Sequence, residues 1–194
     1  MLEYLVIVLG TVVFGLQHSG ISALSVKGRI IDRWGKEGYS RIFTITSILG
    51  VLLPFLAMWY WDWLYFILDP SLVNPILFVS GIVVIAAGVV VATLASKVIS
   101  VSTVADMRTD RKPELITEGL YGKIRHPLYL ATILLFLGIM LIYPFPNVIV
   151  FALSLSAYTL IGAHFEERKL ILHYGEEYLE YKKQVGFIFP KLRR

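Results

Sequence analysis

Two short polar segments of a largely apolar chain hold the residues that could do chemistry. The first runs from Leu115 to Tyr129, and its Arg125-His126-Pro127 directly precedes an apolar run. The second begins with Glu166-Glu167, directly after another apolar run. Ionisable side chains at the edge of a bilayer are costly to desolvate, so they are candidates for function by default.

The residue types in these segments suit the handling of carboxylates and protons. A guanidinium such as that of Arg125 can grip a carboxylate in a two-pronged contact, and Glu167 can serve as a general base. The simpler alternative is that Pro127 only begins a helix, and that Glu166 and Glu167 are solvated ends of the last span, paired with Lys169 or Arg168. Since the chain has no cysteine and His164, Glu167 and His173 lack compact spacing, we expect no thiol chemistry and no metal site. It also lacks the glycine-rich loops of nucleotide-binding folds.

Composition predicts the structure that positions these residues. Of the 194 residues 57% are hydrophobic and 16% are charged, against about 25% charged in soluble domains. We therefore predict an all-α integral membrane protein forming a single membrane domain, with three spans in residues 1–105 and a catalytic half in residues 106–194. Five apolar runs approach the length of about 20 residues that a spanning helix needs. They are Leu2–Ser22, Ile42–Trp61, Pro75–Ser96, Leu128–Tyr143 and Asn147–Ala163.

The last two predicted spans form a C-terminal helical hairpin. The connection Tyr143-Pro-Phe-Pro-Asn147 contains two prolines, which stop a helix and force a tight turn. One helix leaves the membrane face and the next returns to it. The hairpin therefore predicts that His126 and Glu166 lie side by side, although forty residues separate them.

The basic residues predict which side of the membrane carries the site. All 18 Lys and Arg lie in three segments, Lys27–Arg41, Lys97–Arg125 and Arg168–Arg194. With five spans, these segments share one side, which the positive-inside rule makes cytoplasmic. We expect a cytoplasmic site and C-terminus, an external N-terminus and a retained first span, in the cell membrane or an endoplasmic reticulum-like membrane. Orientation then accounts for the net charge of +4, and we expect no nucleic-acid partner.

A second polar helix is predicted after the last span. Tyr174, Tyr178, Tyr181 and Val185 recur at positions that share one helical face, with charged residues on the other face. Such a helix either lies on the bilayer surface or caps the ends of the spans.

Taken together, these segments carry a resemblance to a known family. Leu115-Ile-Thr-x-Gly-x-Tyr121, Arg125-His-Pro-x-Tyr129, Glu166-Glu167, Tyr174-Gly-x-x-Tyr178-x-x-Tyr181 and Phe189-Pro190 resemble the isoprenylcysteine carboxyl methyltransferases and their prokaryotic relatives. The phospholipid N-methyltransferases share the pattern more loosely. The resemblance covers about residues 106–190, and the first three spans carry little of it.

The resemblance implies a reaction and a set of site residues. It implies S-adenosylmethionine as cofactor, with S-adenosylhomocysteine as product, and O-methylation of a carboxylate on a lipophilic, isoprenylcysteine-like substrate from the bilayer. Arg125, Glu166 and Glu167 would be catalytic. The cofactor would contact Pro113, Glu114, Leu115, Ile116, Tyr121, His126, Pro127, Leu128, Tyr129 and Glu166. Gly162 stands where the family often has an arginine assigned to the substrate, which leaves the substrate group open.

Other functions remain open at this stage. A phospholipid or other lipid amine would be an alternative acceptor. Sterol-type membrane reductases that use NADPH carry a similar Arg-His-Pro-Asn-Tyr stretch, although Leu128 replaces the asparagine here. A small membrane scaffold or transporter subunit is the non-enzymatic alternative. Membrane lipid is an expected partner in every case, and we expect a monomer.

Overall fold

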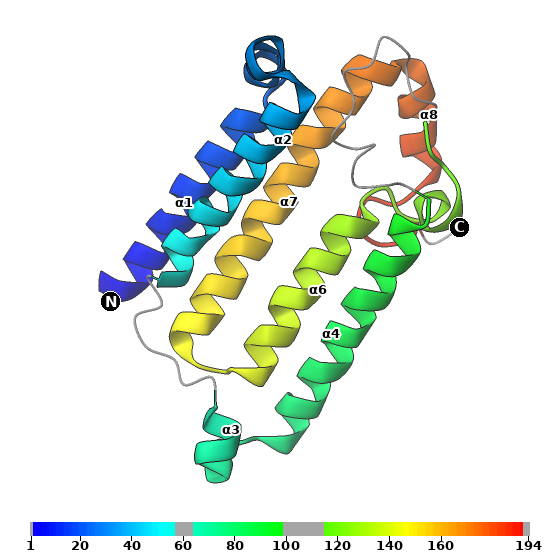
Figure 1. Ribbon diagram of the computed structural model, residues 1–194. Coiled ribbons are helices and arrows are strands. Elements are labelled where there is room, and N and C mark those ends of the chain that lie inside the picture. Colours follow the sequence, from blue (N-terminus) through cyan, green and yellow to red (C-terminus); the bar gives the residue numbers. More distant parts are fainter. Residues whose placement is uncertain (1, 57–63, 99–114, 192–194) are drawn as a thin grey trace. The chain divides into compact units, whose positions relative to one another are not determined.

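The computed structural model describes residues 2–56, 64–98 and 115–191 (Figure 1). These residues form helices, and their one β-type pairing is an isolated parallel bridge between Ile124 and Gly186. The all-α expectation is therefore confirmed. The long helices are α1 (Leu2–Ser22), α2 (Leu24–Leu56), α4 (Pro75–Ser96), α6 (Pro127–Ile142) and α7 (Pro146–Tyr174). The short ones are α3 (Tyr65–Leu68), η1 (Pro70–Leu72), η2 (Gly119–Gly122) and α8 (Glu176–Gln184).

Four of these helices are long and apolar enough to cross a membrane, namely α1, α2, α4 and α7. The predicted bounds of the first and third spans agree with α1 and α4. The fourth predicted span is α6, whose 16 residues extend about 24 Å and fall short of an apolar layer about 30 Å thick. Five spans are therefore not confirmed, although the apolar hairpin of α6 and α7 is present.

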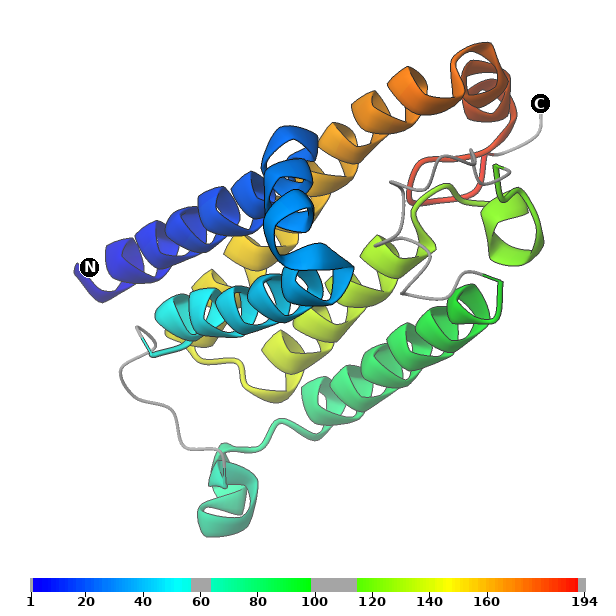
Figure 2. The same cartoon turned by 45° about the horizontal axis from the view of Figure 1, so that its top comes forward.

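The chain divides into two compact units, and the first comprises residues 1–80 and 139–158. Within it α1 and α2 run antiparallel, since Gly10 approaches Pro54 while the His18 Nδ1 lies 2.9 Å from the Ser47 Oγ. Gly35, with φ of 71°, kinks α2, as Figure 2 shows. The predicted second span corresponds to the part of α2 after this kink, and its last residues lie outside the described ones.

The second unit comprises residues 81–138 and 159–194 and contains the two polar segments. Glycines let α4 and α6 approach closely within it. A Cβ added at Gly88 would lie 3.1 Å from the Ala131 carbonyl oxygen, and one at Gly138 would lie 2.9 Å from the Gly81 oxygen. The backbone that carries α6 is thereby fixed against α4. The sequence also predicts a boundary at residue 105, between the three N-terminal spans and the catalytic half. The compact units do not test this boundary, so it stays a prediction.

The end of α7 differs from the expectation. The sequence places the end of the last span at Ala163, but α7 continues through Glu166 and Glu167 to Tyr174. Gly175, with φ of 63°, then turns the chain into α8. The predicted aromatic face of α8 is confirmed, because Tyr178, Tyr181 and Val185 are buried together. Their neighbours are Leu115, Leu170, Ile171 and Tyr174, so this face caps the helix ends.

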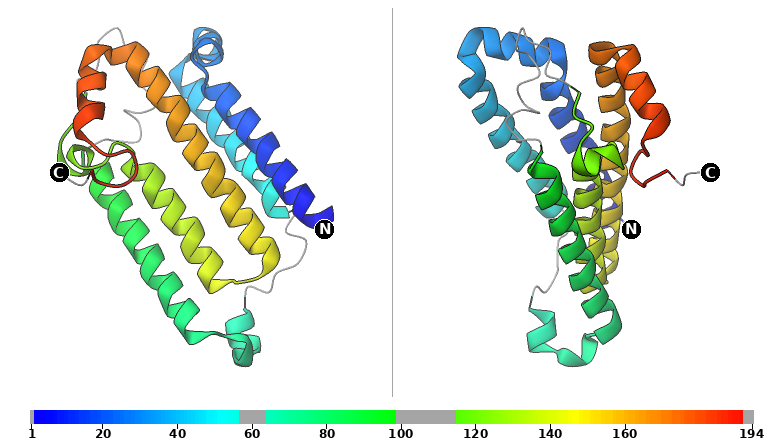
Figure 3. Two further views of the ribbon diagram at one scale, coloured as in Figure 1. Left: turned by 180° about the vertical axis from the view of Figure 1, so that it is seen from behind. Right: turned by 90° about the vertical axis from the view of Figure 1, so that its right-hand side faces the viewer.

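After α8 the chain returns along the segment that precedes α6. We call residues 185–190 the C-terminal strap; it forms part of the red loop in Figure 3. The amide of Arg125 donates to the Gly186 carbonyl at 2.8 Å, and that of His126 donates to the Phe187 carbonyl at 3.1 Å. These bonds join the beginning of α6 to the end of the chain.

Candidate functional site

The segment before α6 places its functional side chains through a tight turn. Gly119, with φ of 60°, opens the turn η2, and the buried Tyr121 lies within it. The Tyr181 hydroxyl of α8 donates to the Tyr121 carbonyl at 2.6 Å. Pro127 occupies the first position of α6, where its missing N–H is no loss. The turn η2, which precedes α6 in sequence, is therefore fixed against α8.

Arg125 is buried, and its Nε and Nη1 both donate to protein groups. Its Nε donates to the Glu167 Oε1 at 2.6 Å, and each of these two side chains is only 6% exposed. Its Nη1 donates to the carbonyls of Val185 and Lys182. A guanidinium held in this way links α7, α8 and the C-terminal strap. Its predicted grip on a substrate carboxylate is not tested by these contacts and stays a prediction.

Glu167 lies between two cations. Its second oxygen accepts a hydrogen bond from the Lys182 Nζ at 2.6 Å, and the Tyr178 hydroxyl lies 3.4 Å from the first. The charge of Arg125 and that of Lys182 therefore both act on this carboxylate. Such an arrangement stabilises the carboxylate anion and opposes proton uptake, which makes Glu167 a poor general base.

His126 and Glu166 lie side by side, as the predicted hairpin requires. The His126 Nδ1 is 3.8 Å from the Glu166 Oε2, and its Nε2 is 3.5 Å from the Glu167 Oε1. The aromatic rings of Tyr129 and Phe187 meet the imidazole edge to face, with centroids 5.4 and 4.9 Å away. Burial, with a smaller contribution from Arg125 and against the opposing effect of Glu167, lowers the pKa of His126 to about 4. The imidazole is therefore neutral at neutral pH.

Two buried atoms of this pair lack a standard hydrogen-bond partner within the described part of the chain. Among the described residues, neither the His126 Nε2 nor the Glu166 Oε2 has a hydrogen-bond partner of standard geometry. Buried polar atoms are rarely left without one, so each such atom needs a ligand or water. Tyr129 supplies a hydrogen bond to Glu166. Tyr121 lies near Glu166. Burial, and after it the negative charge of Glu166, raise the pKa of the Tyr121 hydroxyl to about 12.

Most of the predicted site residues come together in the second unit. His126, Tyr121, Tyr129 and Glu166 form one group, which we call the imidazole–carboxylate cluster. Leu115 and Ile116 are half-buried, and Leu115 packs against the buried face of α8. Pro127 is buried and Leu128 is half-buried at the start of α6. Pro113 and Glu114 lie outside the described residues. Gly162 lies under the Tyr129 ring, where an added Cβ would make an ordinary 3.6 Å contact.

Sequence reasoning missed three residues of this region. Lys182 follows the charged pattern of α8, and nothing in that pattern predicts that it reaches Glu167. The helical spacing of Tyr178 predicts a buried position but not the contact of its hydroxyl with Glu167. Phe187 carries no motif, yet its ring contacts those of His126 and His164 and the guanidinium of Arg125. The chain reversal at Gly175 brings all three residues to the site, and no local pattern in the sequence encodes these contacts.

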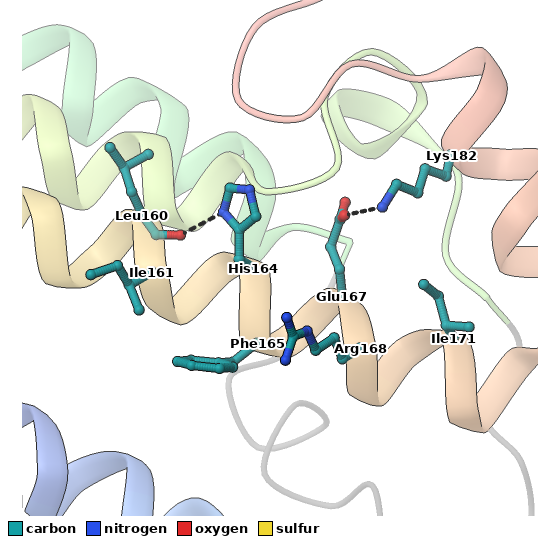
Figure 4. Close-up of a pocket in the computed structure, with 8 residues that line it drawn as sticks. All are labelled: Leu160, Ile161, His164, Phe165, Glu167, Arg168, Ile171 and Lys182. Atoms are coloured by element: carbon teal, nitrogen blue, oxygen red, sulfur yellow. Dashed lines mark hydrogen bonds and ion pairs between the residues drawn. The ribbon is translucent and has the colours of Figure 1, made fainter.

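A hollow of about 380 Å³ opens on the other side of Glu167 (Figure 4). This volume is within the range of small-molecule sites. The hollow is lined by Leu160, Ile161, His164, Phe165, Glu167, Arg168 and Ile171 of α7 and by Lys182 of α8.

Comparison with known proteins finds similarity to methyltransferases. A family model described as phospholipid methyltransferase matches residues 76–177. Methanethiol S-methyltransferase of Pseudomonas sp. (strain GM41(2012)) is 35% identical over 88 residues, which cover 43% of this chain and 32% of that protein. Protein-S-isoprenylcysteine O-methyltransferase of Rattus norvegicus is 40% identical over 81 residues, 41% of this chain and 28% of that protein.

A third relative matches over more of its length. Methanethiol S-methyltransferase of Crocosphaera subtropica is 26% identical over 196 residues, covering 92% of this chain and 71% of that protein. By contrast, the match to the first relative, the methyltransferase of Pseudomonas sp., spans only about a third of that protein's length. No solved structure matches it at a significant level. The family match includes every described residue of the imidazole–carboxylate cluster.

Proposed function

Because the chain belongs to the phospholipid methyltransferase family, we propose that it transfers a methyl group from S-adenosylmethionine to a lipophilic acceptor at a membrane. The observation that carries this proposal is the imidazole–carboxylate cluster. It presents two buried polar atoms that lack partners among the described residues, beside two tyrosine rings. The cluster lies at the start of the apolar helix α6 and on α7, which is long and apolar enough to span a bilayer, and this suits an acceptor that arrives from the membrane.

The residues of the cluster fit the cofactor chemically. A carboxylate such as that of Glu166 accepts hydrogen bonds from hydroxyl and amino groups. The neutral imidazole of His126 offers one donor and one acceptor, and the rings of Tyr121 and Tyr129 offer apolar surface. When bound, S-adenosylmethionine supplies an electrophilic methyl group on a positively charged sulfur. In this proposal Leu115, Ile116, Pro127 and Leu128 complete the walls, and Pro113 and Glu114 extend them.

Arg125 and Glu167 have a positioning role in this proposal. Their ion pair fixes the backbone on either side of His126 and holds α8 against α7. Alignment of donor and acceptor to within a fraction of an ångström is the main task in a displacement that needs no acid or base. Loss of either residue would disturb the cluster without removing a reacting group.

We propose a carboxylate as the acceptor group, on a lipophilic, isoprenylcysteine-like molecule. A carboxylate is already ionised at neutral pH and needs no base. A lipid ammonium must first lose a proton, and Glu167 is held by two cations. The amine alternative therefore lacks the base that the sequence assigned to it. The relative named as a protein-S-isoprenylcysteine O-methyltransferase is compatible with this preference.

We also propose an orientation for the protein in the membrane. The site and the C-terminus would face the cytoplasm and the N-terminus the outside, as the distribution of Lys and Arg predicts. The protein would act as a monomer that takes its substrate from the surrounding lipid.

Binding of S-adenosylhomocysteine to the full chain in detergent tests the proposal. We expect a rise in melting temperature with this ligand, and Glu166→Gln should weaken binding about tenfold to hundredfold through loss of a charged hydrogen bond. Glu177→Gln is the matched control, because Glu177 is exposed on α8. No thermal shift with S-adenosylhomocysteine would refute the cofactor assignment. A shift with NADPH in its place would favour a reductase.

A further inference from the structure

The first unit carries a short basic segment at the end of its helical hairpin. It comprises residues 24–34, the part of α2 before the kink at Gly35, and we call it the surface segment. It follows α1 and precedes the apolar part of α2, and both helices are long and apolar enough to cross a membrane. In the right-hand view of Figure 3 it runs across the ends of these helices. Because the chain turns back here, the segment belongs at the membrane surface.

A buried lysine fixes the direction of the surface segment. The Lys27 Nζ lies over the Tyr39 ring, 5.3 Å from its centroid, and both residues are only 7% exposed. Lys27 precedes the kink and Tyr39 follows it, so this cation–π contact braces the two parts of α2 against each other. The Ala23 amide donates to the Gly20 carbonyl at 3.2 Å, which holds the turn from α1 into the segment. The segment is thus fixed at both of its ends.

The surface segment has a polar side and an apolar side. The residues on its polar side are exposed; they are Ser25, Arg29, Asp32 and Arg33. Those on its apolar side are half-buried; they are Val26, Ile30 and Ile31. Trp34 follows Ile30 by four residues and so shares the apolar side, yet 55% of it is exposed. An indole on the apolar side of a basic helix is typical of helices that lie in the bilayer interface.

Most of the net charge of the chain lies in and beside this segment. Residues 24–41 contain five cations and two carboxylates, an excess of three positive charges in a chain with a net charge of +4. Lys27 is buried, and the exposed Arg41 is paired with Glu37. Within this stretch the other exposed charges are those of Arg29, Arg33, Lys36 and Asp32. Three cations against one carboxylate make this surface attractive to anions.

Arg33 and Trp34 together suit a phospholipid. The Arg33 guanidinium lies over the Trp34 ring, 5.2 Å from its centroid. Arg29 is one helical turn earlier on the same side, with its Nε 3.4 Å from the Ser25 carbonyl oxygen. A guanidinium can hold a phosphate through two N–H donors at once, and an indole is most stable at the depth of the headgroups. Both requirements are met at one place by a lipid phosphate and the acyl chains below it.

We propose that the surface segment binds anionic phospholipid, with Arg29 and Arg33 on the phosphates and Trp34 beside the upper acyl chains. A lipid whose own ammonium cancels its phosphate charge is a weaker partner. This lipid is a neighbour of the fold and not the methyl acceptor. The first unit alone forms the binding surface and contains no residue of the imidazole–carboxylate cluster, so the inference does not depend on the proposed function.

Quenching of Trp34 fluorescence by brominated lipid tests the contact. The chain has four tryptophans, so Trp59, Trp61 and Trp63 are replaced by phenylalanine to leave Trp34 as the emitter. The full chain is placed in phosphatidylcholine nanodiscs that contain a rising fraction of acyl-brominated phosphatidylcholine or phosphatidylglycerol. The two lipids carry the quencher at the same depth and differ in headgroup charge. The difference between the parent chain and Trp34→Phe gives the same quantity without the phenylalanine background.

Two double variants show which cations are responsible. Arg29→Gln with Arg33→Gln removes the proposed phosphate ligands. Arg168→Gln with Lys183→Gln removes two exposed cations of the second unit and is the control for net charge.

We expect half-maximal quenching of Trp34 at a mole fraction of phosphatidylglycerol about fivefold lower than that of phosphatidylcholine, the enrichment that one cation at an anionic surface produces. The Arg29 and Arg33 double variant should lose this preference, and the control should keep it. Salt at about 1 M should reduce the preference, because it shortens the range of exposed charges to about 3 Å.

Three results would overturn the inference. Equal quenching by the two lipids in the parent protein would show that the segment does not select charge. A preference that survives in the Arg29 and Arg33 double variant, or is lost equally in the control, would assign it to the net charge of the protein. Absence of quenching by either lipid would place Trp34 in water or against another protein.

Discussion

Removal of the Arg125 side chain should release α8 and the C-terminal strap from the rest of the second unit. Arg125→Met keeps much of the apolar stem but deletes the hydrogen bonds to Glu167, Val185 and Lys182. Breaking a buried ion pair from one side costs about 3–5 kcal/mol. Lys182 is 40% exposed and still contacts Glu167, so the lower end, about 3 kcal/mol, applies here.

Hydrogen exchange measured by mass spectrometry gives the local stability directly. A loss of about 3 kcal/mol corresponds to exchange about a hundredfold faster in residues 176–190. Peptides from α1 should be unchanged. Arg41→Met is the matched control, because its pair with Glu37 is long at 3.7 Å and highly exposed. An exposed pair of this kind is worth at most about 1 kcal/mol.

The double variant Arg125→Met with Glu167→Leu adds a second check. Removing both charges avoids a buried, half-compensated carboxylate, so part of the lost protection should return, with a coupling of about 1–3 kcal/mol. Unchanged exchange over residues 176–190 in Arg125→Met, together with lost acceptor binding, would refute the positioning role. Arg125 would then contact the substrate, as the sequence suggests.

Three further predictions concern the same unit. The His126 imidazole should show no titration by NMR between pH 7.5 and 5, because its pKa is about 4. Its contribution to stability is complete above the pKa of histidine in the unfolded chain, near 6.5, and is lost as pH falls through 4. An NMR titration midpoint near pH 6.5 would contradict its burial. Gly186→Ala should raise exchange at the amides of Arg125 and His126, because an added Cβ would lie 1.8 Å from the Phe189 oxygen, whereas Gly20→Ala meets open space and should not. Tyr181→Phe should lower stability by about 1–3 kcal/mol in thermal melting, because it leaves the buried Tyr121 carbonyl without its donor, and a neutral result would show that water replaces the hydroxyl.

Local patterns in the sequence predicted the features that depend only on residues close together in the chain. Apolar runs of 21 and 22 residues predicted the bounds of α1 and α4, since in these two helices the apolar run and the helix coincide. The spacing of Tyr178, Tyr181 and Val185 gave the buried face of α8, because the helical period fixes which side chains share a face. The proline turn gave the adjacency of His126 and Glu166, since an apolar hairpin must return to its starting side.

Tertiary structure decided which charges are buried and where they point. The predicted last span ends at Ala163, whereas α7 continues to Tyr174. Its Glu167 is compensated by Arg125 and Lys182, which are 42 and 15 residues away in sequence. The strap that brings Phe187 to His126 depends on backbone bonds between residues about sixty apart. Such long-range pairings have no signature in local periodicity, since the partner of a charge is fixed only when the chain folds. The sequence by itself therefore determined a helical membrane protein and the residues of its cluster, and the fold decided which of the charged residues pair inside the protein.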